Sequence, residues 1–345
     1  MTFSYSIQSL TPIVTGDHDR RNKELLATGL LGSLRYQYWL LKAMEVWKKS
    51  KQENRDPRYP LYSADLAPDA TIQGTSRRLK EALNTAGPVI GLFGTTGWKR
   101  MFKLDITNIE RKPETQPASA RFGEASPSNW RFDIIFRLDR KSAAWEDLGV
   151  NIEEEVDGLM SFVHHYGWLG AAPQNGFGWV KVTGPNGREP DGHSIDSDNP
   201  VFAARDTLLT ESRFQRLRKQ LELFYTAKWE KTSGRNKNRY ANSLRYINQP
   251  QNPPIGYEIR RWLYDREGGN VSPDDCFGRG GKNGYASYIH ITHPISEKNG
   301  WKLRLRFAAR PNRETRHIVP ESLPESPQKM VEKFENILLG QEENG

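Results

Sequence analysis

Glycine-rich stretches beside lysine or arginine are the parts of this sequence best suited to binding chemistry. They span residues 91–97, 170–178 and 278–284. Glycine has no Cβ, so several backbone N–H groups of such a turn can approach one anion. The neighbouring cations are Lys99, Arg100, Lys181, Arg279 and Lys282. None of the stretches ends in the Gly-Lys-Ser/Thr of a P-loop. One alone is typical of a tight turn, whereas three beside cations favour binding of a phosphate backbone.

The positive charge of the chain is concentrated in one segment. The 345 residues have a net charge of +8, and residues 213–245 alone hold ten basic and two acidic residues. The basic residues are Arg213, Arg216, Arg218, Lys219, Lys228, Lys231, Arg235, Lys237, Arg239 and Arg245. The interleaved aromatic residues are Phe214, Phe224, Tyr225, Trp229, Tyr240 and Tyr246. Cations neutralise phosphates and aromatic rings stack on unpaired bases, which indicates single-stranded RNA. The alternative is an amphipathic helix with a solvated basic face.

Histidines are the candidates for catalysis. His18 lies between Asp17 and Asp19, where the three could hold a metal or His18 could act as a general base on a 2′-hydroxyl. His164 and His165 are neighbours on a predicted helix, point in different directions and cannot share one metal. The motifs of zinc proteases, EF-hands and serine hydrolases are missing. We therefore assign no catalytic residue, no metal ligand and no cofactor.

Composition excludes several classes of protein. The aromatic content (10 Trp, 13 Tyr and 14 Phe) excludes a wholly disordered chain. Cys276 is the single cysteine, which excludes a disulfide within the chain and a cysteine-rich zinc site, and this fits the reducing cytoplasm. The apolar runs are too short for a membrane span. The first residues lack a basic start followed by an apolar stretch, so we expect no secretory signal and no membrane partner.

The first half of the chain shows the element order of a split βαβ fold. The predicted elements are a strand at 3–9, a helix at about 30–49 with Thr28 as its N-cap, a short helix at 76–86 ended by Gly87-Pro88, a strand within 98–109, a strand at 131–138, a helix at 152–166 and a strand within 167–184. The acidic residues of the helix at 152–166 lie near its start, where the helix dipole favours them. The order strand, helix, strand, strand, helix, strand is the ferredoxin-like pattern.

The second half repeats this theme in a degenerate form. The predicted elements are a basic helix at about 201–230, a polar segment at 231–254 that is mobile without a partner, a helix at 255–266 and strands within 285–295 and 301–310. Residues 28–41 align with 255–265, and residues 92–106 with 276–291. We therefore predict an α+β protein of two tandem ferredoxin-like (RRM-like) domains with glycine-rich loops. The expected limits are 1–190 and 191–345, with a basic helical insertion at about 201–254.

Four short motifs resemble a known family. They are Thr-Pro-Ile-Val-Thr-Gly at 11–16, Gly-Leu-Leu-Gly-Ser-Leu-Arg-Tyr at 29–36, Leu-Phe-Gly-Thr-Thr-Gly at 92–97 and the glycine-rich stretch at 170–178. Together they resemble the RAMP proteins of CRISPR effector complexes, and most nearly the first-numbered subunit family of the Cmr module, the type III-B RNA-targeting complex. The resemblance covers residues 1–185 clearly and the second half through the degenerate repeat.

The resemblance implies a binding subunit without catalysis of its own. Its expected partners are the guide (crRNA), whose 3′ part it contacts, the target single-stranded RNA that it helps to capture, and other RAMP subunits. Carried over by position, the RNA-binding residues are Gly32, Arg35, Gly94, Gly97, Gly176 and Gly178. Leu31 and Ala172 stand where the family often has a basic residue. This departure shifts the expected phosphate contacts toward Arg35, Lys99, Arg100 and Lys181.

Three other functions stay open at this point. The chain could be the metal-independent, crRNA-processing RAMP endoribonuclease, which shares the fold and needs a general base such as His18. It could be another RAMP subunit of the same complex. It could also be an interaction protein whose basic face contacts acidic partner subunits.

Overall fold

The structure is a computed structural model that describes most of the chain. The described residues are 1–15, 24–60, 87–94, 100–112, 129–138, 151–171, 173, 176–192, 195–249, 255–267, 288–309 and 326–341. The predicted helix at 76–86 and the predicted site residues Gly97, Lys99, Arg279 and Lys282 lie outside them, as does His18. The backbone of Arg235 is described, but its side chain is not.

The first four strands form one antiparallel sheet. The elements are β1 (Thr2–Ser9), α1 (Ala27–Gln52), α3 (Pro88–Phe93), β2 (Phe102–Lys112), β3 (Asn129–Leu138), α5 (Ile152–His165) and β4 (Val180–Thr183). The strand order is β2-β3-β1-β4, and every neighbouring pair is antiparallel. Two crossing helices and a sheet in this order make the ferredoxin-like fold, so the prediction for the first half is confirmed.

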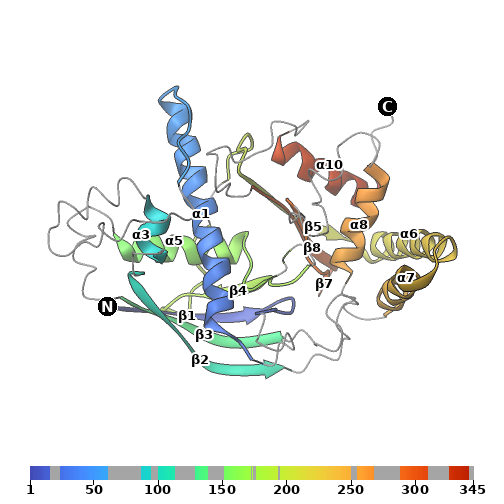
Figure 1. Ribbon diagram of the computed structural model, residues 1–345, viewed down its shortest axis with the longest axis horizontal. Coiled ribbons are helices and arrows are strands. Elements are labelled where there is room, and N and C mark those ends of the chain that lie inside the picture. The colour runs from blue at the N-terminus through green and yellow to red at the C-terminus, as the bar shows by residue number, and fades with distance from the viewer. Residues whose placement is uncertain are drawn as a thin grey trace.

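Alternating side chains give the first sheet one covered face. Phe3, Tyr5 and Ile7 of β1 are buried, while the residues between them are exposed. Figure 1 shows α1, α3 and α5 on the same side of this sheet. The Tyr5 hydroxyl donates a hydrogen bond to Asp157 of α5, which joins the two layers. The other face is polar, and no described helix covers it.

The ends of the helices follow local hydrogen bonding. At α5, the Asn151 side chain accepts from the amides of Glu153 and Glu154, and acidic residues fill the first turn as predicted. The prediction of Thr28 as the N-cap of α1 is wrong, because the helix already begins at Ala27. The Thr15 hydroxyl accepts the Leu26 amide at 3.4 Å instead, so a distant residue replaces the local cap.

A short helix occupies part of the first predicted glycine turn. Residues 88–93 form α3, although Gly87-Pro88 was expected to stop a helix rather than to start one. Proline suits the first helical turn, because the amide it lacks would have no partner there. Gly94 ends α3 with a φ of +76°, a conformation that favours glycine.

The second sheet repeats three of the four strand positions. Its elements are β5 (Phe202–Leu209), α6 (Glu211–Glu230), α7 (Gly234–Ile247), α8 (Gly256–Glu267), β6 (Ile289–Ile291), β7 (Ile295–Glu297), β8 (Gly300–Ala308) and α10 (Pro327–Leu339). The order β5-β8-β6 matches β1-β3-β2, and β7 continues along the same edge of β8 as β6. The helix α8 lies between β5 and β6 in the chain, as α1 lies between β1 and β2. This agrees with the alignment of residues 28–41 with 255–265. The α+β class with two ferredoxin-like sheets is confirmed, whereas the limits 1–190 and 191–345 stay a prediction.

Two predictions for the second half are wrong. Residues 202–209 form β5 rather than the start of a helix, because pairing with β8 overrides the helical preference of an alanine- and arginine-containing segment. The helix begins at Glu211, with Thr210 as its cap. The segment 231–254 was expected to be mobile, but 234–247 form α7. Tyr246 and Ile247 are buried and anchor that helix on its neighbours.

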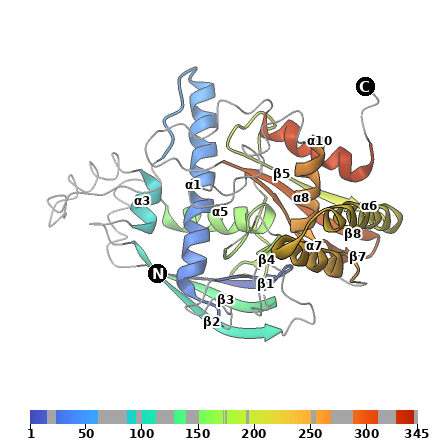
Figure 2. The ribbon, with the colours of Figure 1, turned by 45° about the vertical axis from the view of Figure 1, so that its right-hand side comes forward.

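The helices α6 and α7 lie side by side at the end of the molecule farthest from α3, as Figures 1 and 2 show. No helix among the described residues is long and apolar enough to cross a membrane.

A backbone contact joins the two sheets. The carbonyl of Gly176, in the loop between α5 and β4, accepts the amide of His293 at 3.1 Å. His293 lies in the break between β6 and β7. Gly176 has a φ of +95°, and a Cβ added to it would lie 2.5 Å from Nδ1 of His293. Only glycine fits this junction without strain.

We expect Gly176→Ala to lower the free energy of unfolding by about 2–4 kcal/mol, because it adds backbone strain and a steric clash. Gly187→Ala is the matched control. Gly187 also has a positive φ, +70°, but an added Cβ meets nothing within 4 Å. Its expected loss is about 1 kcal/mol, from strain alone. Urea unfolding measures both, and equal losses for the two variants would contradict this description of the junction.

Candidate nucleic-acid interface

The helical hairpin of α6 and α7 carries the basic segment, but half of its aromatic residues are in the core. Phe214, Tyr225 and Tyr246 are buried. Phe214 stacks on Trp301 of β8, with 4.4 Å between ring centroids. These three rings cannot stack on RNA bases, so that part of the prediction is wrong. They hold the hairpin on the second sheet.

The basic side chains of the hairpin divide into two groups. Several bind within the protein: Arg218 Nε donates to the Ile247 carbonyl at 2.9 Å, and Lys228 pairs with Asp265 at 2.7 Å. Arg216 and Lys219 lie exposed on α6 and make no hydrogen bond or ion pair in the described part of the chain. They lie three residues apart and therefore on one face of the helix. Their charges are available to a phosphate backbone.

The predicted residue Lys237 has an internal partner. Its ammonium lies 4.4 Å from the centroid of the Trp229 ring, a cation–π contact. Trp229 is therefore at least partly covered by a cation of the same chain. Arg239, the next predicted residue, donates to the Tyr257 hydroxyl of α8.

The glycine-rich loop at 170–178 uses its amides inside the protein. The Gly178 amide donates to the Pro12 carbonyl at 2.9 Å, and the Gly176 amide to the Pro173 carbonyl at 3.0 Å. The prediction that these amides face a phosphate is wrong for this conformation. Glycine is needed because the backbone of the loop packs directly against the segment after β1.

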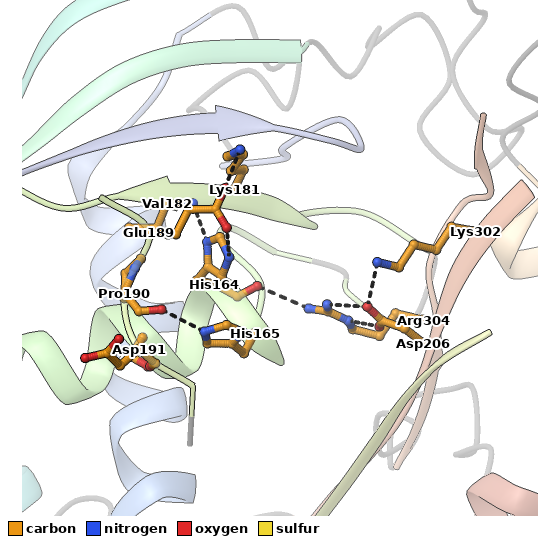
Figure 3. A network of polar contacts seen from close by, with 11 residues as sticks. His164, His165, Lys181, Val182, Glu189, Pro190, Asp191, Asp206, Lys302 and Arg304 are labelled. Carbon is orange, nitrogen blue, oxygen red and sulfur yellow. Dashed lines mark hydrogen bonds and ion pairs between the residues drawn. The ribbon is translucent and has the colours of Figure 1, made fainter. Parts of the chain in front are cut away.

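The remaining predicted residues are spread over the first sheet and its helices. Gly32 is exposed on α1, and a Cβ added there meets nothing within 4 Å. Arg35, three residues on, is half-buried. Arg100 is half-buried two residues before β2. Lys181 pairs with Glu189 at 2.5 Å, as Figure 3 shows, so much of its charge is already neutralised.

A row of cations that we did not predict lies where the two sheets meet. Lys302, Arg304 and Arg306 occupy alternate positions of β8 and so share one face of the strand. Lys302 and Arg304 lie 5.7 and 4.7 Å from the ring centroid of Trp179. Arg306 lies 5.3 Å from that of Trp168. The alternation of basic and apolar residues in Trp-Lys-Leu-Arg-Leu-Arg-Phe is the signal that could have revealed this face.

One carboxylate serves two cations of this row. Asp206 of β5 accepts from Arg304 at 2.5 and 2.9 Å and lies 3.1 Å from Lys302. Arg304 also donates to the His164 carbonyl at 3.4 Å, which links the second sheet to α5 (Figure 3). The neighbouring cations lower the pKa of Asp206 against the opposing effect of its burial.

Arg306 is the exception in the row. Its side chain is 1% exposed, and none of its guanidinium nitrogens hydrogen-bonds within the described chain. Burial lowers its pKa well below the usual range. The face of Trp168 offsets only part of the cost of removing a cation from water.

The histidines are structural in the described chain. His164 Nδ1 accepts the Val182 amide at 3.0 Å, and His165 Nε2 lies 2.9 Å from the Pro190 carbonyl (Figure 3). Burial lowers the pKa of His164 and lowers that of His293 to about 3. No group of three or more potential ligands among the described residues could hold a metal ion.

A buried carboxyl lies beneath the hairpin. Glu258 of α8 is 2% exposed, and its Oε1 accepts from Ser243 of α7 at 3.3 Å. Its Oε2 has no partner in the described chain. Burial raises the pKa of Glu258 to about 7. The carboxyl is therefore partly protonated at neutral pH.

A comparison with family models assigns the chain to a family. The sequence model of the RAMP superfamily matches residues 6–181. Chains from two cryo-EM structures of type III-B Cmr-beta also match. One complex is bound to cognate target RNA (10% identity, TM-score 0.46, 98% of this chain and 99% of the other). The other is bound to cognate target RNA and AMPPnP in the presence of ssDNA (9% identity, TM-score 0.44, 98% of each chain). No curated protein sequence matches the chain.

We expect Arg306→Met to raise the free energy of unfolding by about 1–3 kcal/mol, because it removes an unpaired buried charge and keeps most of the side-chain volume. Arg304→Met should instead lower it by about 1 kcal/mol or more, because Asp206 loses one of its two cationic partners. Urea unfolding of both variants tests the contrast. A loss of stability in Arg306→Met would show that its contact with Trp168 outweighs the burial of its charge.

Glu258 should make stability depend on pH. The unfolded chain loses this proton near pH 4.3 and the folded chain near pH 7. Stability is therefore lost as pH rises between these values, by about 4 kcal/mol in total. Buried histidines act in the opposite direction, so the quantity to measure is the difference between wild type and Glu258→Gln at each pH. A difference that stays constant from pH 4 to 8 would contradict the raised pKa.

Proposed function

We propose, from the premise that the chain belongs to the RAMP superfamily, that it is a non-catalytic RNA-binding subunit of a type III-B CRISPR effector complex. The family model spans half of the chain. In this proposal the subunit contacts the 3′ part of the guide RNA, helps to capture target RNA, and works in the cytoplasm beside other RAMP subunits. The motifs at 11–16, 29–36 and 92–97 support the assignment to the Cmr module.

The observation that carries the RNA-binding proposal is the uncompensated charge on the hairpin. Arg216 and Lys219 have no partner among the described residues, whereas several other basic residues form ion pairs, as Lys181 does with Glu189. A segment whose net charge equals that of the whole chain concentrates this field on one part of the molecule. Such a surface attracts a phosphate backbone without reading its sequence.

Gly32 supports a contact on α1. A glycine inside an exposed helix costs about 1 kcal/mol relative to alanine. Nothing in the described chain needs the space above Gly32, since an added Cβ would meet no atom within 4 Å. A ligand backbone that lies against this part of α1, with Arg35 one turn away, explains why position 32 has no side chain.

The open face of the first sheet does not support binding in the manner of an RRM. Its residues on β1 are Thr2, Ser4, Ser6 and Gln8, and its aromatic neighbours point into the core. RRM domains stack bases on aromatic side chains of the exposed sheet face. We therefore assign RNA to the helical side and the hairpin rather than to this face.

Binding of labelled single-stranded RNA to the purified chain tests the proposal. We expect intact RNA and an affinity that falls steeply with salt. Arg216→Gln/Lys219→Gln should reduce the slope of log K against log [salt] by about 1.4, the value for two phosphate contacts on a single strand. Arg137→Gln is the matched control, because this exposed arginine is paired with Asp105 at 2.6 Å.

One outcome would overturn this function, and another would exclude the hairpin as its binding surface. RNA cleavage that persists in EDTA and disappears in His18→Ala would make the chain a metal-independent endoribonuclease. Salt-insensitive binding, or equal effects of the hairpin and control variants, would remove the hairpin from the RNA-binding surface.

A further inference from the structure

Two arginines and two tyrosines interlock between α7 and α8. Arg239 of α7 donates to the Tyr257 hydroxyl of α8 and lies 5.7 Å from the centroid of that ring. Arg261, one turn further along α8, donates to the Tyr240 hydroxyl of α7 at 2.9 Å and lies 5.1 Å from its ring centroid. We call Arg239, Tyr240, Tyr257 and Arg261 the Arg–Tyr cluster.

The guanidinium groups of this cluster have no carboxylate partner. Within the described chain, neither Arg239 nor Arg261 forms an ion pair, and the groups that they bind are neutral hydroxyls. Other arginines of the chain differ: Arg137 pairs with Asp105, Arg205 with Glu332 and Glu335, and Arg304 with Asp206. The cluster therefore keeps two positive charges that pair with no carboxylate of the described residues.

The nearest acidic group does not cancel this charge. Glu258 lies between Tyr257 and Arg261 in the sequence of α8. Its side chain is buried under α7, where it accepts a hydrogen bond from Ser243. Burial raises its pKa to about 7, so it carries only part of a negative charge at neutral pH. Arg239 is exposed and Arg261 is half-buried, so an anion can reach both from the surface.

The tyrosines position the guanidinium groups rather than offering a surface for a base. Arg239 and Arg260 lie over the Tyr257 ring, and Arg261 lies over that of Tyr240. These contacts restrict the long side chains, which lowers the entropy cost of binding a ligand. Guanidinium forks match the oxygen geometry of phosphate.

We propose that the Arg–Tyr cluster binds a phosphodiester of single-stranded RNA through Arg239 and Arg261. This inference rests on the proposed function and adds a second contact to it, separate from Arg216 and Lys219. The site recognises the phosphate and no base, so it contributes affinity without sequence preference.

The test compares RNA binding by full-length variants whose folding is checked by thermal unfolding. Arg239→Gln/Arg261→Gln should lower the affinity for single-stranded RNA by about tenfold or more, because charge-assisted hydrogen bonds to the phosphate are lost. It should also reduce the salt slope by about 1.4. Arg239→Lys, at an exposed position that cannot unfold the chain, should weaken binding and keep the salt slope, because the charge stays and the fork is lost. Arg205→Gln, which removes a paired arginine, should match wild type.

The outcomes separate this inference from the proposed function. If wild type binds RNA and the Arg–Tyr variants bind it equally well, the inference is wrong and the function stands. If they bind RNA equally but lose affinity for polyglutamate, the cluster is a site for an acidic protein. If wild type binds no RNA, the function fails. In that case the Tm is measured with added inorganic pyrophosphate. A rise in Tm for wild type but not for Arg239→Gln/Arg261→Gln supports the anion site, and no rise in wild type overturns it.

Discussion

The loop between α5 and β4 depends on close backbone contact, and both sheets are positioned by it. On one side it hydrogen-bonds the segment after β1, through the Gly178 amide and the Pro12 carbonyl. On the other side the Gly176 carbonyl accepts the His293 amide, and His293 Nδ1 accepts the Gly256 amide at the start of α8. Side chains larger than hydrogen would separate these backbones. The same loop therefore sets the places of Trp168 and Trp179, on which the cations of β8 lie.

Cations have two distinct uses in this molecule. Where the sheets meet, Lys302 and Arg304 both pair with Asp206 and lie over the ring of Trp179. Their charges therefore stabilise the packing of the two sheets. On the hairpin, Arg216 and Lys219 have no such partners among the residues that the structure describes. The division explains why net charge alone is a poor guide to a binding surface: the basic residues that matter are those that the fold leaves uncompensated.

The sequence predicts the first sheet well because its signals are local. Alternation in β1 and β3 and the acidic first turn of α5 each specify an element without distant contacts. The errors have a common physical cause in pairing between distant segments. Residues 202–209 become a strand only because β8 lies beside them, and 234–247 become a helix because Tyr246 and Ile247 find a core. The glycines of the loop at 170–178 were assigned to phosphate because their packing against Pro12 is not visible in the sequence. The Arg–Tyr cluster needs two helices brought together, so sequence reasoning found only Arg239 and Tyr240, which both lie in the segment 213–245.

The strand β8 is buried on both faces, by α10 and the hairpin on one side and by the first sheet's loop on the other. A ferredoxin-like unit standing alone would leave one sheet face in water. Here separation would expose Lys302, Arg304 and Arg306 on the second unit and the contacting ring of Trp179 on the first. We therefore expect a fragment that begins after β4 to present a half-covered sheet face to other chains and to aggregate.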